Sequence, residues 1–156
     1  MRPKKLLLLV PLFGAGCMVV PARPPAAAIP SASPDEVATF AELVNAHRRQ
    51  VGCKPLLWVR EVAAVAQAHS ENMYRHNFFD HVDQDGHDPF QRLQGAHIRY
   101  RLAAENIAAG QFTAEMVLEA WLSSSGHRRN IENCALLEHG VGLSHNRWTH
   151  LLVTRR

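Results

Sequence analysis

The sequence predicts an α+β domain in which helices come first and a β-hairpin comes last. Apolar side chains recur at helical spacing through much of residues 34–75 and again after Thr113. Near the end of the chain, Val141 and Leu143 alternate with small residues, and an apolar run follows over residues 148–153. A short polar segment separates these two stretches, as in a hairpin. The chain shows no long β-α-β alternation, so we expect a layered α+β domain without repeats or a second domain.

The first half of the domain is predicted to be helical. One helix is expected over residues 34–50, with Ser33 as its N-cap and Glu36 completing a capping box. A second helix is expected over residues 61–75, and its apolar face carries Val62, Val65, Ala66, His69 and Met73. On that face His69 is interpreted as a core histidine with a hydrogen-bond partner. Residues 76–88, rich in Asp, Gly and His, are expected to form a loop.

The second half mixes short helices and strands. Asp88 can cap a short helix, and Thr113 can cap a longer one that continues to Ser124. Residues 103–109 form a short apolar run that indicates a strand, with Glu105 in its middle. An unpaired buried charge is costly, so this carboxylate must face a partner or a cavity.

The N-terminal residues have the features of an export signal. Residues 1–28 combine a basic start, an interrupted apolar stretch too short for a membrane span, and small residues at a cleavage site. We therefore expect a signal peptide over 1–28, a short linker over 29–33 and one domain over 34–156. The alternative is a lipoprotein signal with a lipid anchor on Cys17, although Gly14 is unusual three residues before that cysteine.

The charge of the whole chain belongs mostly to its signal. The chain has 17 basic and 14 acidic side chains, a net charge of +3 and a pI of about 9.0. Four basic residues and no acidic ones fall within 1–28, so 13 basic and 14 acidic side chains remain, for a net charge of −1. No basic stripe with interleaved aromatic residues remains either, and we expect no nucleic-acid partner.

Two cysteines remain after the signal, Cys53 and Cys134. An even pair in an exported chain predicts a disulfide. The loop of about 80 residues that it closes would stabilise the fold by about 4 kcal/mol in the chain-entropy model. Two buried thiols are the alternative.

Histidine is the residue type that points to chemistry. The chain contains ten histidines but no H-E-x-x-H motif, so a metal site would have to combine distant segments. His81, Glu105 and His127 lie in apolar surroundings, and two imidazoles with one carboxylate suit zinc or a similar divalent ion. A structural hydrogen-bond network is the alternative. The acidic run from Asp80 to Asp88 lacks the terminal Glu of a calcium loop, which favours a solvated turn.

Five ordered motifs resemble one known family. They comprise residues 66–73, 78–81, 105–110, 121–131 and 140–142, including Phe-Phe-Asp-His, Glu-Asn-Ile and Gly-His-Arg. In order and spacing they are similar to the CAP superfamily of cysteine-rich secretory, antigen 5 and pathogenesis-related type 1 proteins, also called SCP-like domains. The bacterial secreted branch is the nearest in pattern. The resemblance covers residues 40–153.

This resemblance implies a three-layer α-β-α sandwich with a central antiparallel sheet and a large cleft. His81 and His127 match the two cleft histidines, and Glu105 matches the acid of the Glu-Asn-Ile motif. The second acid of animal and plant members falls on Ser124, a departure that removes one charged ligand. The resemblance also supports pairing of Cys53 with Cys134. Asn106 and Asn130 are expected to brace loops.

The resemblance further implies a secreted, extracellular monomer with a non-catalytic binding role and no membrane span. We expect its cleft residues, His81, Glu105, Ser124 and His127, to bind a divalent metal ion, a small lipid or a peptide. Zinc is the expected ion, with His81, Glu105 and His127 as ligands. The alternative function is a hydrolase that depends on a metal or on His127 acting as base for Ser124 or Ser125. No oxyanion-hole signature accompanies these serines.

Overall fold

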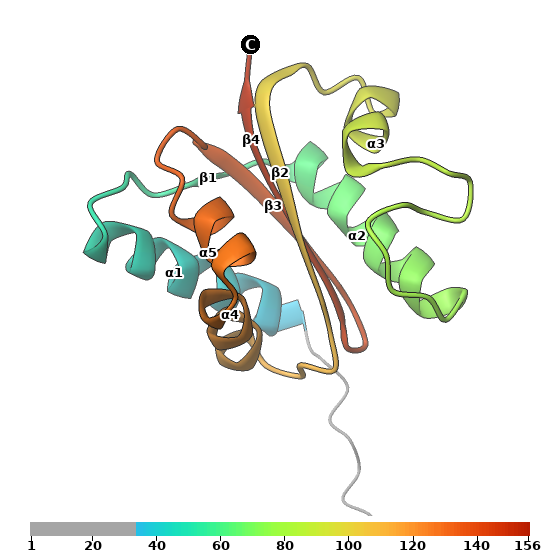
Figure 1. The fold of residues 1–156 in the computed structure, drawn as a ribbon, viewed down its shortest axis with the longest axis horizontal. Helices are drawn as coiled ribbons and strands as arrows, with labels where there is room; N and C mark the ends of the chain where they lie inside the picture. The colour runs from blue at the N-terminus through green and yellow to red at the C-terminus, as the bar shows by residue number, and fades with distance from the viewer. Residues whose placement is uncertain (1–33) are drawn as a thin grey trace, which may run out of the picture.

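The computed structural model describes residues 34–156, which form three layers (Figure 1). On one face of the sheet lie α1 (Pro34–Gln50), α4 (Ala114–Ser123) and α5 (Ser125–Ile131). On the other face lie α2 (Arg60–Arg75) and α3 (Pro89–Gly95). The predicted signal peptide, linker and Cys17 lie outside the described residues. Within residues 34–156 no helix is both long enough and apolar enough to cross a membrane.

The central sheet has four strands in the order β1-β3-β4-β2. Their bounds are β1 Leu57–Trp58, β2 Tyr100–Ala109, β3 Glu138–Ser144 and β4 Arg147–Arg155. Strands β3, β4 and β2 pair antiparallel, whereas the two-residue β1 pairs parallel with β3. The predicted sandwich with a central antiparallel sheet is therefore confirmed, with a short parallel strand added at one edge. Strand β2 also begins three residues before the predicted start.

Strand β4 lies at the centre of the core because helices cover both faces of the sheet. Its residues from Trp148 to Thr154 are all buried, as expected for a strand that packs on two sides. Trp148 packs with side chains of α1 and α4, whereas Leu151 packs with side chains of α2 and α3. Gly140 and Gly142 of β3 let α2 approach closely, since a Cβ at either position would overlap the helix backbone.

Helix α1 has the predicted bounds, but its Glu36 carboxylate has a tertiary partner. Glu36 Oε2 accepts a hydrogen bond of 2.7 Å from the N–H of Ala114, at the start of α4. This contact satisfies one of the free N–H groups at the N-terminus of α4 and ties the two helices together. The predicted capping box also involves Ser33, which lies outside the described residues.

The predicted disulfide joins Cys53 to Cys134, which are 81 positions apart in sequence, with their Cα atoms 4.9 Å apart. It fixes the segment after α5 to the end of α1. The buried Arg48 holds the same segment, because its guanidinium donates to the carbonyl oxygens of Lys54, Ile131, Asn133 and Leu136. Helix α5 is thus anchored at its C-terminal end by a covalent link and by a buried cation.

Candidate functional site

The loop after α2 and strand β2 bring two of the predicted site residues into contact. His81 Nδ1 lies 2.8 Å from Glu105 Oε1. The Glu105 side chain is 1 % exposed, whereas the His81 side chain is 47 % exposed. Glu105 is therefore a buried carboxylate that holds a solvent-accessible imidazole by one ring nitrogen. The expectation that the strand carboxylate must face a partner is confirmed.

Arg92 of α3 is a member of this cluster that the sequence did not indicate. Its Nη2 donates to Glu105 Oε2 at 2.7 Å, and its Nη1 donates to the backbone oxygens of His81 and His87 at 2.8 Å. The guanidinium therefore neutralises Glu105 and fixes the loop that carries His81. An arginine in a short helix gives no local sign of such a role, because the contact depends on how α3 folds against β2.

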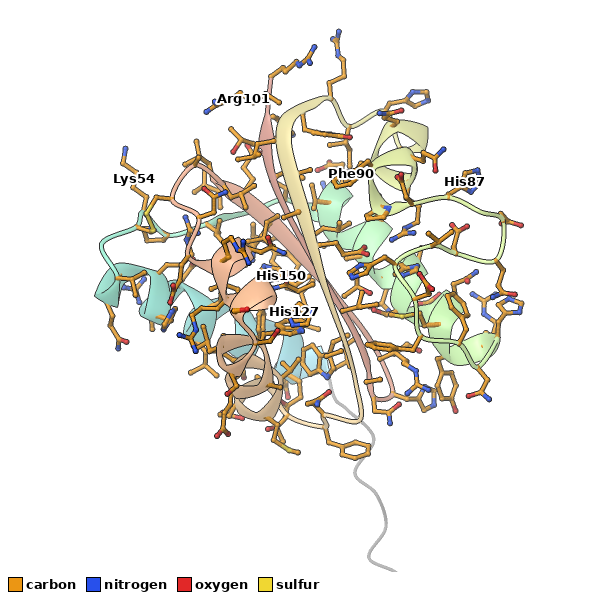
Figure 2. The ribbon with its side chains drawn as sticks, in the orientation of Figure 1. Lys54, His87, Phe90, Arg101, His127 and His150 are labelled. Atoms are coloured by element: carbon orange, nitrogen blue, oxygen red, sulfur yellow. A yellow bond between two sulfur atoms is a disulfide. The ribbon has the colours of Figure 1, made fainter. Side chains whose placement is uncertain are left out.

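His127 lies on the opposite side of β2, in the first turn of α5, and is half-buried (Figure 2). Asn106 of β2 donates to the backbone oxygen of His127 at 3.1 Å, and Asn130 donates to Asn106 Oδ1 at 2.8 Å. These two amides fasten α5 to the strand that carries Glu105. They have the bracing roles expected of them.

Ser124 does not lie on a continuous helix as predicted. Helix α4 ends at Ser123, and Ser124 has an extended backbone with φ −98° and ψ 121° before α5 begins. The run of serines and Gly126 has low helix propensity, so the chain can bend here and start a new helix. Within the described residues, no hydrogen bond joins the hydroxyl of Ser124 or Ser125 to His127. The helix expected after Thr113 thus ends one residue earlier than predicted, and Ser124 forms the break before α5.

The geometry of a metal site differs from the predicted three-ligand set. Both oxygens of Glu105 already have partners, His81 and Arg92. Among residues 34–156, one trio of His, Cys, Asp or Glu side chains brings its ligand atoms within 4.8 Å of one another, and that trio is not His81, Glu105 and His127. In this geometry Glu105 orients an imidazole and is not a free ligand.

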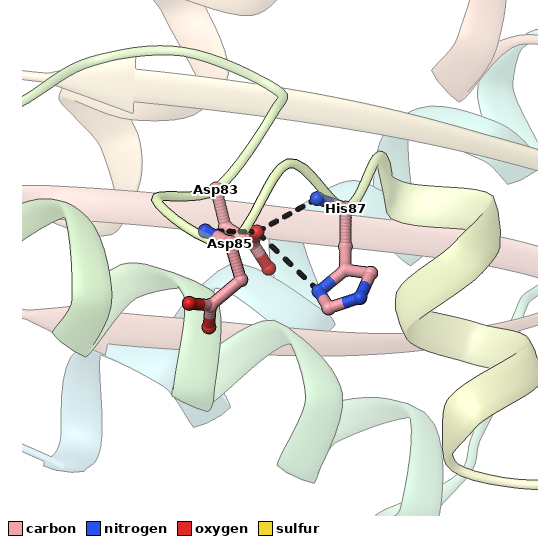
Figure 3. A group of neighbouring side chains, drawn as sticks. All are labelled: Asp83, Asp85 and His87. Atoms are coloured by element: carbon pink, nitrogen blue, oxygen red, sulfur yellow. Dashed lines mark hydrogen bonds and ion pairs between the residues drawn. The ribbon is translucent and has the colours of Figure 1, made fainter.

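That trio is Asp83, Asp85 and His87, in the exposed loop before α3 (Figure 3). Asp83 Oδ1 accepts hydrogen bonds from the N–H groups of Asp85 and His87, at 3.0 and 2.8 Å. Asp88 caps α3 through a capping box with Gln91. These carboxylates hold their own backbone, as in the solvated turn that the sequence favoured.

Known proteins share both the sequence pattern and this fold. The profile of the cysteine-rich secretory protein (CAP) family matches residues 41–152. The chain belongs to the CAP family. It is 40 % identical over 114 residues to the protein YkwD of Bacillus subtilis strain 168, and 33 % identical over 114 residues to the membrane protein YlbC of the same strain. These stretches cover 72 % and 73 % of the chain but 44 % and 33 % of the relatives, so the chain spans less than half of their length.

Solved structures agree with this family. An extracellular protein with an SCP domain from Bacillus anthracis matches with a TM-score of 0.75 and 30 % identity, over 78 % of this chain and 41 % of that one. An outer surface protein of Borrelia burgdorferi matches with a TM-score of 0.74 and 19 % identity, over 79 % of this chain and 95 % of that one. The second match shows the fold alone.

The environments of His81 and His127 in this CAP domain shift their pKa values in opposite directions. The hydrogen bond to Glu105 raises the pKa of His81, although partial burial and Arg92 oppose the shift. Burial lowers the pKa of His127, and the nearby His81 lowers it further. Over the interval between these two pKa values, the first imidazole is protonated while the second is neutral. Such a pair can supply an acid and a base, or two metal ligands once the proton on His81 is displaced.

A second histidine pair lies deeper, between α1 and the sheet. His139 Nδ1 of β3 and His150 Nε2 of β4 are 3.2 Å apart, and both residues are buried. Burial lowers the pKa of His139 to about 4 and that of His150 well below 6.5. His69, the predicted core histidine, is also buried, with Nε2 3.0 Å from the backbone oxygen of Asp80.

Proposed function

We propose that this CAP domain is an extracellular binding domain whose cleft holds a zinc ion through the imidazoles of His81 and His127. The observation that carries the proposal is the bond between His81 Nδ1 and the buried Glu105 carboxylate. This bond leaves Nε2 of the exposed His81 ring available as a ligand. Histidines that bind metals are commonly oriented by a carboxylate in this way, which also raises their basicity.

The remaining residues of the cleft fit a partly open metal site. The lowered pKa of His127 keeps its imidazole neutral, the form that binds a metal. Ser124 contributes no charge. Two imidazoles leave coordination positions for water or for a carboxylate or phosphate of a small lipid or peptide. When bound, the ion would supply a Lewis acid that attracts such a ligand.

Calorimetric titration of the metal-free protein with zinc tests this function. His81→Ala and His127→Ala should each weaken binding at least ten-fold, since each removes one of two protein ligands. His76→Ala removes an exposed imidazole outside the cleft and should bind as the wild type does. Asp83→Asn tests the loop trio. Equal heats in the wild type and both cleft variants would contradict the proposal, and so would a loss confined to Asp83→Asn.

Export is the second part of the proposal. A disulfide between Cys53 and Cys134 is typical of proteins that fold in an oxidising compartment. Mass spectrometry of the protein recovered outside the cytoplasm should give a chain that starts near Ile29. A lipid mass on Cys17 would instead indicate an envelope-attached lipoprotein.

A hydrolase is the alternative function, and the opposed pKa shifts of His81 and His127 favour it. A protonated and a neutral imidazole on either side of β2 could act as general acid and general base. A panel of peptide and ester substrates, tested with His81→Ala and His127→Ala, separates this function from binding. Hydrolysis that both substitutions abolish would establish catalysis in the cleft. Activity that neither substitution changes would place catalysis elsewhere.

A further inference from the structure

A cluster of arginines forms at the end of the sheet farthest from the β3–β4 turn. Strands β2 and β4 pair antiparallel, with Tyr100 opposite Arg155, so the start of one strand meets the end of the other. The N–H of Arg156 donates to the backbone oxygen of Arg99 at 3.3 Å. Residues far apart in sequence thus become neighbours. We call His97, Arg99, Arg155 and Arg156 the arginine corner.

Two adjoining hollows open at the arginine corner, with volumes of about 450 and 460 Å³. They share His97, Ile98, Arg99 and Arg156 as lining residues. Tyr100 lines the first hollow, and Glu61 and Glu138 line the second. Both volumes fall in the range of pockets that bind small molecules.

The charge at the arginine corner is only partly compensated. Arg155 pairs with Glu138 at 2.7 Å, and Glu61 lies near enough to raise the pKa of Arg155 slightly further. Arg99 and Arg156 take part in none of the ion pairs formed by residues 34–156. Exposed Arg101 adds a further cation at this end of the sheet (Figure 2). In a domain with a net charge near zero, this is a local excess of positive charge, and like charges on neighbouring strands repel one another.

His97 gives the arginine corner a second feature, an unusual backbone conformation at the end of α3. It ends α3 in a Schellman arrangement, with Ile98 N–H bonded to Leu93 O at 3.0 Å and His97 N–H bonded to Gln94 O at 2.9 Å. The φ of His97 is +59°, at the position where glycine is usual. The chain therefore accepts a strained backbone and places an imidazole where glycine would serve the helix better. That imidazole lines both hollows.

We propose that the arginine corner is a binding site for a phosphate-bearing ligand. Guanidinium groups present planar pairs of N–H donors that match phosphate oxygens, and His97 adds a ring donor. Ile98 and Tyr100 provide an apolar floor for an uncharged part of the ligand. Ile98 is buried and Tyr100 is half-buried, so neither of these two side chains projects from the corner as a membrane anchor would. A discrete phosphate group in the hollows therefore fits better than a lipid surface.

The test uses tripolyphosphate as the probe, with metal-free protein at constant ionic strength. Calorimetry should show binding to the wild type and at least ten-fold weaker binding to the double variant Arg99→Gln/Arg156→Gln. The control Arg49→Gln/Arg129→Gln removes the same charge from exposed positions on α1 and α5, and its affinity should stay within two-fold of the wild type. Tripolyphosphate should also raise the Tm of the wild type and the control, but not that of the corner variant.

A single substitution at His97 separates binding from folding. His97→Gly suits the left-handed backbone, so its Tm should equal or exceed that of the wild type, whereas its affinity for tripolyphosphate should fall. Equal affinity in the wild type and the corner variant would overturn the proposal. An equal loss in the control would overturn it too, because the attraction would then be diffuse. Tighter binding to phosphatidylglycerol vesicles than to tripolyphosphate, at equal phosphate concentration, would replace the hollow with a membrane surface.

Discussion

Two pairs of histidines in this domain have different roles because one pair reaches solvent and the other is buried in the core. His81 and His127 flank the outer strand β2, and a buried carboxylate holds His81 by one nitrogen. His139 and His150 bond to each other in the core, and His150 packs against Phe40 and Trp121 with ring centroids 5.0 and 5.8 Å away. The first pair reaches solvent and can exchange protons or bind a ligand. The second pair has no carboxylate partner among the described residues and stays neutral.

An arginine lies near each pair, and the two arginines have different kinds of partner. Arg92 pairs with the Glu105 carboxylate and donates to the backbone oxygen of His81 in the loop after α2. Arg48 donates only to backbone oxygens, and these bonds hold the segment after α5 against α1. Beside β2 an ion pair thus lies next to a titratable imidazole, whereas in the core a cation is satisfied by carbonyl groups. Substitutions in each region test whether the two pairs differ in these ways.

The largest effect is expected in the buried region. Arg48→Met should lower the free energy of unfolding by about 4 kcal/mol, since it leaves buried carbonyl oxygens without donors. Guanidinium unfolding of the protein with its disulfide intact measures this loss. Arg49→Met, at the exposed neighbouring position, should change stability by less than about 0.5 kcal/mol. Equal losses in the two variants would show that Arg48 has no structural role.

Acid should destabilise the protein through the buried pair. The pKa of His139 is about 4 in the folded state against 6.5 unfolded, so protons bind the unfolded chain first. This histidine alone should cost about 3 kcal/mol of stability as the pH falls from 6.5 to 4. His139→Asn should flatten the curve of stability against pH in that window, whereas the exposed His76→Asn should keep the wild-type curve. A His139→Asn curve as steep as that of the wild type would contradict the assignment.

The ion pair between Arg92 and Glu105 is expected to contribute somewhat less to stability than the contacts of Arg48. Arg92→Met leaves the Glu105 carboxylate buried with His81 as its remaining side-chain partner, and we expect a loss of about 3 kcal/mol. Urea unfolding at neutral pH measures it, with the exposed Arg75→Met as the control. A change as small as that of the control would mean that Glu105 is not held by this pair.

The smallest effect on stability, and the most specific one, concerns His81. Glu105→Gln removes the carboxylate that raises the pKa of His81, so this pKa should fall. In the wild type the raised pKa contributes stability below pH 6.5 that is lost as the pH rises through the folded value. Zinc affinity should accordingly begin to fall at a lower pH in Glu105→Gln than in the wild type. An unchanged pKa of His81, measured by NMR titration, would contradict the assigned cause.

Periodicity and capping are sufficient to predict much of the fold. The bounds of α1, the cap at Thr113 and the hairpin before Trp148 follow from local patterns, since such elements depend mainly on nearby residues. Strand β1 does not follow from them, because two residues show no periodicity and their pairing depends on β3. The break at Ser124 has a local sign, because the apolar residues of α4 end at Leu122 and the serines and Gly126 that follow have low helix propensity.

The residues of the candidate site also differ in whether the sequence predicts them. A carboxylate in an apolar strand predicted a partner for Glu105, and the motifs pointed to His81. Arg92 could not be found this way, because its contact spans α3, β2 and the loop between α2 and α3. The arginine corner is a similar case. Arg99 and Arg156 lie far apart in the sequence, and the antiparallel pairing of β2 with β4 makes them neighbours.

Zinc binding by His81 and His127, but not by the core histidines His139 and His150, can be tested in one NMR measurement. Long-range ¹H–¹⁵N spectra of the imidazoles, recorded with and without one equivalent of zinc at neutral pH, report on every histidine at once. We predict that Nε2 of His81 and one ring nitrogen of His127 shift to metal-bound values, while His139 and His150 keep their signals. Zinc-induced shifts at His87 with unchanged His81 and His127 would contradict the account.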